Sequence, residues 1–144
     1  MRQMQTLHLS DETQMLTLGA KLAVQLSAGQ TVALTGGLGV GKTTLARGMI
    51  QSLLGEIDVP SPTYTLIQTY ECRDFELWHC DMYRLERPED GYELGLEDAF
   101  EDAVCLIEWP DKLGALFPED ALSIHIDFEG EGRKVSLTGF EEIT

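Results

Sequence analysis

The sequence predicts an α/β fold in which helices pack on a mostly parallel sheet that carries antiparallel strands at one side. Three patterns support this fold class. Residues 31–35 form a short apolar run that leads through a glycine-rich turn into a helical repeat over 42–54. Residues 104–107 are continuously apolar, which is typical of a central parallel strand. Residues 121–128 alternate between apolar and polar side chains, as in a half-buried strand.

The first helix is predicted over residues 11–28. Ser10 is a good N-cap, and the acidic residues Asp11 and Glu12 suit the positive end of the helix dipole. Apolar side chains then recur at helical spacing until Gly29 ends the helix, namely Met15, Leu18, Leu22 and Leu26. This pattern indicates a helix that packs against the core.

The remaining elements follow from shorter patterns. Residues 63–70 and 75–83 predict two strands, and the short link between them favours an antiparallel hairpin. Residues 86–102 are very acidic and are expected to be helical or irregular, either as a solvated face or as a docking surface for a basic partner. A glycine-rich turn precedes a last strand over 133–138. No linker or repeat divides the chain, so a single domain over residues 1–144 is predicted.

The charge balance restricts the partners. The 144 residues hold 25 Asp and Glu against 10 Lys and Arg, a formal net charge of −15. Such a surface repels nucleic acid unless a basic patch intervenes, and the sequence shows no such patch. Any nucleic acid is therefore expected to be held by a partner protein.

The cysteines and the hydropathy indicate a compartment. Cys72, Cys80 and Cys105 are an odd number without C-x-x-C spacing, which predicts neither a disulfide framework nor a zinc site. Cys80 and Cys105 lie in apolar strand-like runs and are interpreted as buried thiols in a reducing compartment. No apolar run approaches the roughly 18 residues of a membrane span, and no signal stretch opens the chain. A cytoplasmic protein is expected.

The glycine-rich turn carries the strongest functional motif. The segment of residues 36–44 contains the pattern G-x-x-x-x-G-K-[ST] and lies between a predicted strand and a predicted helix. Glycines let backbone amides wrap a phosphate, and the helix start directs its dipole at the same anion. We therefore predict binding of ATP with Mg²⁺, and its hydrolysis, at Gly36, Gly37, Leu38, Gly39, Val40, Gly41, Lys42, Thr43 and Thr44.

Specific roles follow for the end of the motif and for two carboxylates. Lys42 places a cation on the β and γ phosphates, and the Thr43 hydroxyl is a hard oxygen ligand for Mg²⁺. Glu108 follows the predicted central strand, at the sheet edge where ligands bind, and is predicted to hold the metal directly or through water. Asp81 ends another strand and is the second acidic candidate, for holding the metal or orienting the attacking water. His79 shares a face with Asp81 and is interpreted as a satisfied strand histidine.

Other segments leave alternatives open. The hydroxyls of residues 61–65 could sense the γ-phosphate, or the segment could be a proline-stiffened connector. The Trp109 ring could cover the nucleotide, cover a partner surface or fill the core edge. Arg84 and Arg87 could supply charge to a transition state or pair with the acidic stretch.

These motifs together resemble one family. Residues 36–44, SPTYTL at 61–66, HCDMYRL at 79–85 and LIEWP at 106–110, in this order, resemble TsaE (YjeE) proteins over about residues 10–133. The resemblance implies an ATPase, weak alone, that acts with TsaD and TsaB in the threonylcarbamoyladenosine modification of adenosine 37 in tRNA.

The resemblance also implies site residues and an assembly. It implies Mg²⁺ held by Thr43 and Glu108, and a nucleotide base approached by Asp11 and Arg133. Alone, the chain is expected to be a monomer or to associate weakly, without binding tRNA. The family usually has Asp in place of Gly37 and Ala in place of Val40, changes that leave the phosphate geometry intact.

Three other functions are less well supported or overlap with this one. A small-molecule kinase needs an acceptor pocket and usually an arginine-bearing lid, for which no segment is found. A GTPase is suggested by D-x-x-G at residues 111–114, but no motif that reads guanine follows. An ATP-gated adaptor, in which binding drives assembly and hydrolysis resets it, is compatible with the resemblance.

Overall fold

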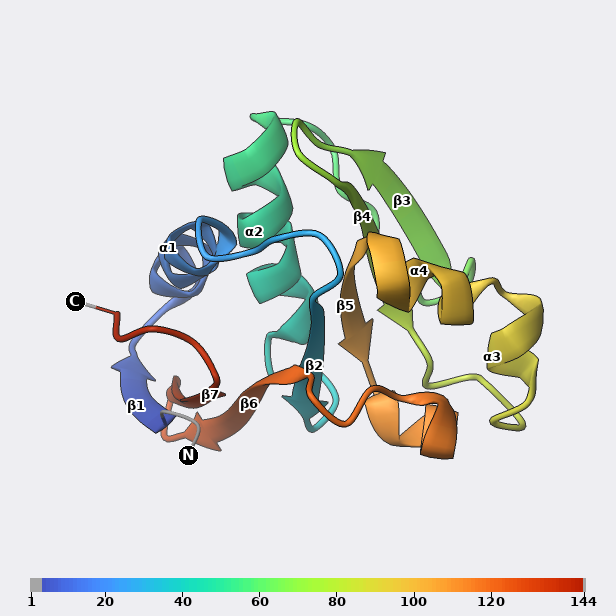
Figure 1. The fold of residues 1–144 in the computed structure, drawn as a ribbon. Helices are drawn as coiled ribbons and strands as arrows, with labels where there is room; N and C mark the ends of the chain where they lie inside the picture. The colour runs from blue at the N-terminus through green and yellow to red at the C-terminus, as the bar shows by residue number, and fades with distance from the viewer. Residues whose placement is uncertain (1–3, 144) are drawn as a thin grey trace.

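A seven-stranded mixed sheet organises the computed structural model, which describes residues 4–143 (Figure 1). The strand order is β1-β7-β6-β2-β5-β4-β3. The strands are β1 (Met4–Leu9), β2 (Thr31–Gly36), β3 (Ile67–Glu71), β4 (Glu76–Asp81), β5 (Val104–Glu108), β6 (Leu122–Glu129) and β7 (Gly132–Thr138). Strand β2 lies in the centre and pairs in parallel with both β5 and β6, and β4 is parallel to β5.

The predicted α/β class with a mostly parallel core is confirmed, but the antiparallel strands lie at both edges rather than at one side. Strands β3 and β4 form the predicted hairpin at one edge. At the other edge β7 folds back on β6 through a tight turn, in which Gly130 has a φ of 59°, and β1 adds antiparallel to β7. The sequence did not predict β1, whose side chains are half-buried or exposed.

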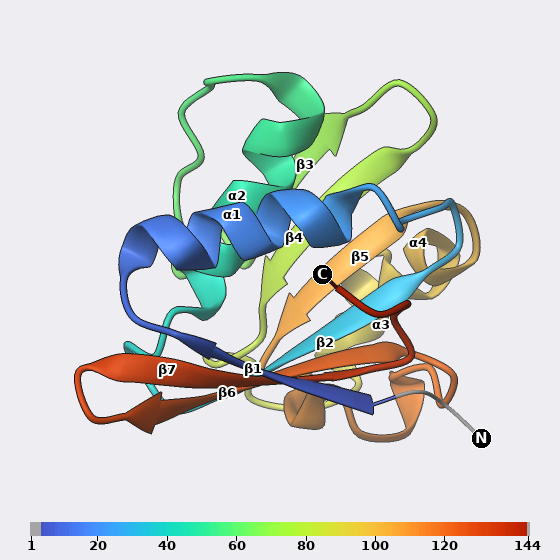
Figure 2. The ribbon, with the colours of Figure 1, turned by 90° about the vertical axis from the view of Figure 1, so that its left-hand side faces the viewer.

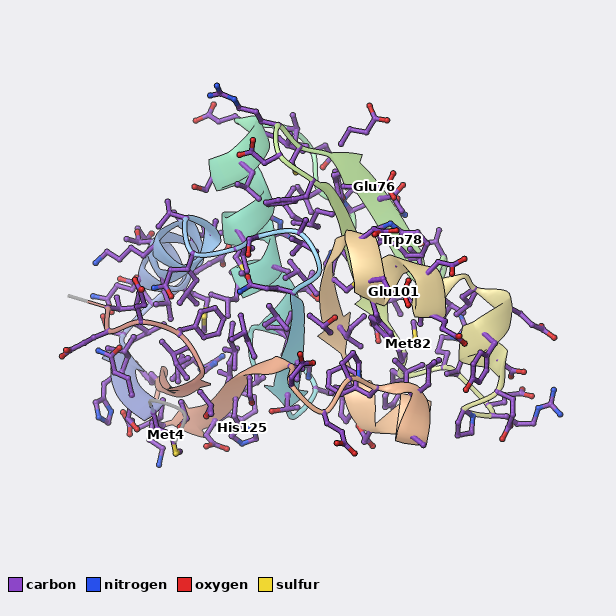
Figure 3. The ribbon with its side chains drawn as sticks, in the orientation of Figure 1. Met4, Glu76, Trp78, Met82, Glu101 and His125 are labelled. Atoms are coloured by element: carbon purple, nitrogen blue, oxygen red, sulfur yellow. The ribbon has the colours of Figure 1, made fainter. Side chains whose placement is uncertain are left out.

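Helices cover both faces of the sheet. They are α1 (Glu12–Ala23), α2 (Lys42–Leu54), α3 (Asp90–Glu93), α4 (Leu96–Asp102) and the 3-10 helix η1 (Pro110–Leu116). Helices α1 and α2 cross one face (Figure 2) and enclose the larger apolar core, and α4 and η1 enclose a second core on the other face, in which Met82 is fully buried (Figure 3). No helix within residues 4–143 combines the length and apolar character needed to span a bilayer.

The contact between α1 and α2 is close enough to require glycine. A Cβ atom on Gly19 would lie 2.6 Å from the carbonyl oxygen of Leu45, and one on Gly48 would lie 2.5 Å from that of Leu16. Backbone meets backbone at both points, so no side-chain rotation can relieve the overlap. This crossing fixes α2, and therefore the start of α2, relative to the sheet.

Helix α1 is shorter than predicted. Its N-cap is Asp11 rather than Ser10, because the Asp11 carboxylate accepts a hydrogen bond from the Gln14 amide at 2.9 Å. The helix ends at Ala23, and the next turn is tied to the C-terminal segment by two hydrogen bonds between the Gln25 side chain and the Glu141 backbone. A long-range contact of this kind cannot be read from local spacing.

The cysteines lie as expected for unpaired thiols. Cys80 and Cys105 are buried and Cys72 is half-buried, and all three are free. Burial raises the pKa of the Cys105 thiol to about 12 and holds that of Cys80 well above its ordinary value. The two buried thiols are therefore unreactive packing groups.

Candidate functional site

The glycine loop leaves the carboxyl end of β2 and returns at the start of α2. Gly36, Gly39 and Gly41 have φ values of 136°, 73° and 121°, a region that favours glycine. At Gly36 a Cβ atom would also lie 2.4 Å from the carbonyl oxygen of Ile126 on β6. The backbone path of the loop therefore depends on these glycines.

The start of α2 presents unpaired amides to the space above the loop. Its N-cap, Gly41, offers no side-chain acceptor, and the first turn holds no acidic residue. The first backbone bond joins the Leu45 amide to the Gly41 carbonyl at 2.9 Å, so the amides of residues 42–44 precede the hydrogen-bond ladder. Such amides, together with the helix dipole, favour an anion at this point.

Lys42 is held at the same place. Its ammonium group donates to the carbonyl oxygens of Gly36 at 2.6 Å and Gly37 at 2.9 Å, and it lies 4.3 Å from the centroid of the Trp109 ring. Burial lowers the pKa of Lys42, although the nearby carboxylates of Glu108 and Asp81 act in the opposite direction. A buried cation with these partners gains from a further negative charge.

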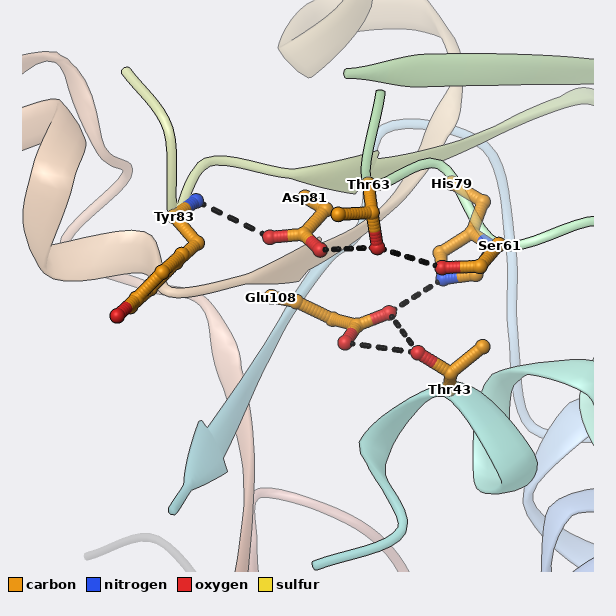
Figure 4. A network of polar contacts seen from close by, with 7 residues as sticks. All are labelled: Thr43, Ser61, Thr63, His79, Asp81, Tyr83 and Glu108. Atoms are coloured by element: carbon orange, nitrogen blue, oxygen red, sulfur yellow. Dashed lines mark hydrogen bonds and ion pairs between the residues drawn. The ribbon is translucent and has the colours of Figure 1, made fainter. Parts of the chain in front are cut away.

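The Thr43 hydroxyl faces the carboxylate of Glu108 (Figure 4). It lies 3.1 Å from Oε1 and 3.0 Å from Oε2 of Glu108, which is 3% exposed at the end of β5. The same Oε2 lies 2.7 Å from Nε2 of His79, a fully buried side chain on β4. Three elements thus meet at one carboxylate, and a hard cation has both a hydroxyl and a carboxylate within reach.

Asp81 ends β4 beside Glu108 and is tied to the segment after α2 (Figure 4). Its Oδ2 accepts from the Thr63 hydroxyl at 3.3 Å, and its Oδ1 accepts from the amide of Tyr83 at 3.0 Å. Thr63 is in turn 2.8 Å from the hydroxyl of Ser61. The amide of Asp81 also donates to the carbonyl oxygen of Leu66 at 2.8 Å. These contacts bring the Thr63 hydroxyl to the Asp81 carboxylate and the Ser61 hydroxyl next to Thr63.

The loop separates two cavities. One, of about 260 Å³, is lined by residues that include Lys42, Thr43, Thr63, Asp81, Glu108 and Trp109. The other, of about 230 Å³, is lined by residues that include Asp11, Met15 and Arg133. Residues 39–41 and Thr44 line both cavities. This arrangement suits an elongated ligand that passes over the loop.

The structure brings together nearly all the predicted site residues, in two groups. The loop with Asp81 and Glu108 surrounds the first cavity, and Asp11 and Arg133 line the second. Gly36 and Gly37 are not among the residues that line either cavity, and their carbonyl oxygens accept hydrogen bonds from Lys42.

Arg133 is already engaged with the protein. Its Nε donates to the carbonyl oxygen of Val40 at 2.7 Å, its Nη1 donates to that of Gly132 at 2.8 Å, and its guanidinium lies 4.6 Å from the centroid of the Phe128 ring. Arg133 therefore supports the loop as well as lining the cavity.

Arg84 and Arg87, which had two open interpretations, are not among the residues that line the cavity of Asp81 and Glu108. Arg87 pairs with Asp90 at 3.1 Å on the surface, as the interpretation of a surface arginine expects. Arg84 stacks on the exposed ring of Tyr64 at 5.2 Å.

Sequence reasoning missed the contact between His79 and Glu108. The alternation along β4 placed His79 on the face of Asp81 but could not show that Oε2 of Glu108, on the neighbouring strand, lies within 2.7 Å. It also left open the position of Trp109, which has a φ of 57° and stacks against both Lys42 and Tyr83. The motif L-I-E-W placed these residues next to each other but not around the lysine.

The site fits Mg²⁺ better than a metal held by protein alone. Among residues 4–143, no group of three or more His, Cys, Asp and Glu side chains is placed to hold a metal ion. Mg²⁺ characteristically takes one or two protein oxygens and completes its shell with phosphate and water. Thr43 and Glu108 offer such a partial shell.

A glycine loop between a central parallel strand and a helix, with a lysine at its mouth and a hydroxyl facing a strand-end carboxylate, defines the P-loop class of α/β proteins. The chain belongs to the TsaE family. The family model described as "Threonylcarbamoyl adenosine biosynthesis protein TsaE" matches residues 9–135.

Relatives agree along nearly the whole chain. The tRNA threonylcarbamoyladenosine biosynthesis protein TsaE of Haemophilus influenzae is 40% identical over 138 residues, which cover 92% of this chain and 87% of the relative. The protein of the same name from Nostoc sp. is 35% identical in an alignment of length 144 that covers 96% of this chain and 88% of the relative. Among solved structures, the crystal structure of Bacillus subtilis YdiB superposes with a TM-score of 0.81 at 26% identity, covering 98% of this chain and 88% of that one.

Proposed function

We propose that the chain binds ATP with Mg²⁺ across the two cavities and hydrolyses it, weakly alone and together with TsaD and TsaB in the cytoplasm, in support of threonylcarbamoyladenosine formation at adenosine 37 of tRNA. The observation that carries this proposal is the convergence of the α2 amides, the Lys42 ammonium and the pair of Thr43 and Glu108 on one cavity. Membership of a family named for this modification supports the pathway.

Each residue acts through an atom already in place. The amides of residues 42–44 and Lys42 bind the phosphates, and Thr43 and Glu108 hold the metal. When bound, Mg²⁺ neutralises charge that develops on the phosphates. Asp81 accepts a hydrogen bond from the attacking water, and its bonds to Thr63 and Tyr83 fix the carboxylate in that orientation.

The base and ribose fit the second cavity. Asp11 at the start of α1 and Arg133 on β7 both line this cavity, and Met15 adds an apolar surface. Because Arg133 holds the Val40 carbonyl, a base that contacts Arg133 also stabilises the loop.

The partner proteins follow from charge and family. A chain with a net charge of −15 is a poor ligand for tRNA, so the tRNA is bound by TsaD and TsaB. Size-exclusion chromatography of the chain with TsaD and TsaB, with and without ATP, tests this step. A complex that needs ATP supports the proposal, and comigration with tRNA in the absence of both proteins contradicts it.

Lys42→Ala tests the nucleotide site. In the unsubstituted chain, ATP with Mg²⁺ at 100 times the Kd adds ~2.7 kcal/mol to the free energy of unfolding. We expect Lys42→Ala to lose this stabilisation, and its retention would remove Lys42 from the site. With labelled ATP, we expect the γ-phosphate to be released as inorganic phosphate. Transfer of that phosphate to a metabolite would instead favour the alternative function, a small-molecule kinase.

A further inference from the structure

His79 is an unusual residue for its position. It is 0% exposed on β4, between strands β3 and β5, where its register partners are Gln68 and Leu106. One ring nitrogen, Nε2, lies 2.7 Å from Oε2 of Glu108. A carboxylate only accepts hydrogen bonds, so Nε2 carries the proton and donates it.

The other ring nitrogen has no partner. Nδ1 of His79 is one of the few buried side-chain atoms in residues 4–143 for which the structure shows no hydrogen bond. An unsatisfied buried polar atom costs free energy, and a leucine of similar volume would avoid that cost. Apolar packing of the sheet alone therefore does not account for a histidine here.

The contact with Glu108 does account for it. Nε2 of His79 donates to Oε2 alone, whereas the Thr43 hydroxyl lies almost equally close to Oε2 and Oε1, and these two donors hold the carboxylate in one rotation. With Oε2 fixed, Oε1 is the freer oxygen, and Glu108 lines the cavity that the start of α2 also lines.

We propose that His79 is a positioning residue for Glu108, so that Oε1 and the Thr43 hydroxyl are presented together to Mg²⁺; this inference rests on the proposed function. His79 does not touch the metal or the nucleotide. It acts as the outer partner of a metal-binding carboxylate, a kind of contact whose removal typically costs 10- to 100-fold in metal affinity or activity.

Three substitutions of His79 distinguish the hydrogen bond to Glu108 from the volume that the side chain fills. In His79→Gln the side-chain amide nitrogen is the same number of bonds from the backbone as Nε2, so a donor still reaches Glu108. In His79→Asn the amide nitrogen stops at the place of Nδ1 and cannot reach. His79→Leu fills the volume without a donor.

The measurement is equilibrium binding of the non-hydrolysable analogue AMPPNP, as a function of free Mg²⁺ and in EDTA, alongside thermal unfolding. We expect His79→Leu and His79→Asn to need about tenfold more Mg²⁺ for half of the binding signal. His79→Gln should stay within about threefold of the unsubstituted chain. Binding in EDTA should be equal in all four proteins, and thermal unfolding should show that all four are folded.

An unchanged Mg²⁺ requirement in whichever of His79→Leu and His79→Asn folds would overturn the inference while leaving the proposed function in place. If a variant instead loses as much AMPPNP binding in EDTA as in Mg²⁺, its phosphate loop is damaged. This result would also overturn the inference. No Mg²⁺-dependent binding by the unsubstituted chain would remove the proposed function, and the inference with it.

Discussion

Asp81 and Glu108 are register partners at the carboxyl ends of two neighbouring parallel strands, β4 and β5. Both are nearly fully buried and line the same cavity, yet their hydrogen-bond partners differ. Glu108 faces the Thr43 hydroxyl at the start of α2, whereas Asp81 faces the Thr63 hydroxyl after α2. Two adjacent carboxylates thus face hydroxyls that come from two different segments of the chain.

Isosteric amides should separate the roles of these carboxylates. We expect Glu108→Gln to raise the Mg²⁺ concentration needed for half-maximal ATPase activity by more than about tenfold, because a neutral amide is a poorer ligand for a hard cation. Asp81→Asn should bind ATP with Mg²⁺ normally but lose about 100-fold in kcat, since a neutral amide oxygen accepts from the attacking water more weakly than a carboxylate does. Steady-state kinetics with separate titrations of ATP and Mg²⁺ measure both effects, and identical defects in the two variants would contradict the division.

The Thr63 hydroxyl should matter more than that of Ser61. Thr63 donates to Asp81, whereas Ser61 contacts only Thr63 in this chain of hydroxyls. Thr63→Val keeps the shape and removes the donor, so we expect kcat to fall by about tenfold through a less well held Asp81. Ser61→Ala is the matched control and should change kcat by less than about twofold. Equal effects would indicate that residues 61–65 act as a connector only.

The sequence predicted the parts of the site that depend on local patterns. The glycine loop, the bounds of α2 and the burial of β5 each follow from residues that lie next to each other, and the structure places them as predicted. The feature that favours an anion is local as well, because the glycine loop and the start of α2, which supply the unpaired amides, are adjacent in the sequence.

The parts that were missed depend on contacts between distant segments. Strand β1 has a weak pattern because it lies at an edge, and it exists through its pairing with β7, more than 120 residues away. The contact of His79 with Glu108 depends on the lateral fit of β4 and β5. Neither the register of parallel strands nor the direction of a side chain across them is encoded by spacing alone.

The α1–α2 crossing offers a stability prediction. Gly48→Ala should gain up to about 1 kcal/mol of helix propensity. The new methyl group would, however, lie 2.5 Å from the Leu16 carbonyl oxygen. We expect overpacking to prevail, with the free energy of unfolding falling by about 1–3 kcal/mol. Urea unfolding measures it, and Ser52→Ala at an exposed position of the same helix is the control, expected within about 0.5 kcal/mol of the unsubstituted chain. A Gly48→Ala protein as stable as this control would show that the helices can separate without cost.

Because of Lys42, the free energy of unfolding of the nucleotide-free chain should change with pH in the alkaline range. Burial lowers the pKa of Lys42 in the folded chain below its ordinary value of 10.5, so the unfolded chain binds more protons at this site over the range just below 10.5. Stability rises with pH wherever the unfolded state binds more protons. We therefore expect the unsubstituted chain to gain stability relative to Lys42→Met as the pH rises from 8 toward 10.5. Urea unfolding of both proteins at several pH values measures this difference, with Lys112→Met as a control for removing a lysine elsewhere. A difference that stays constant or shrinks would mean that the ammonium of Lys42 is stabilised by its carbonyl and carboxylate partners more than it is penalised by burial.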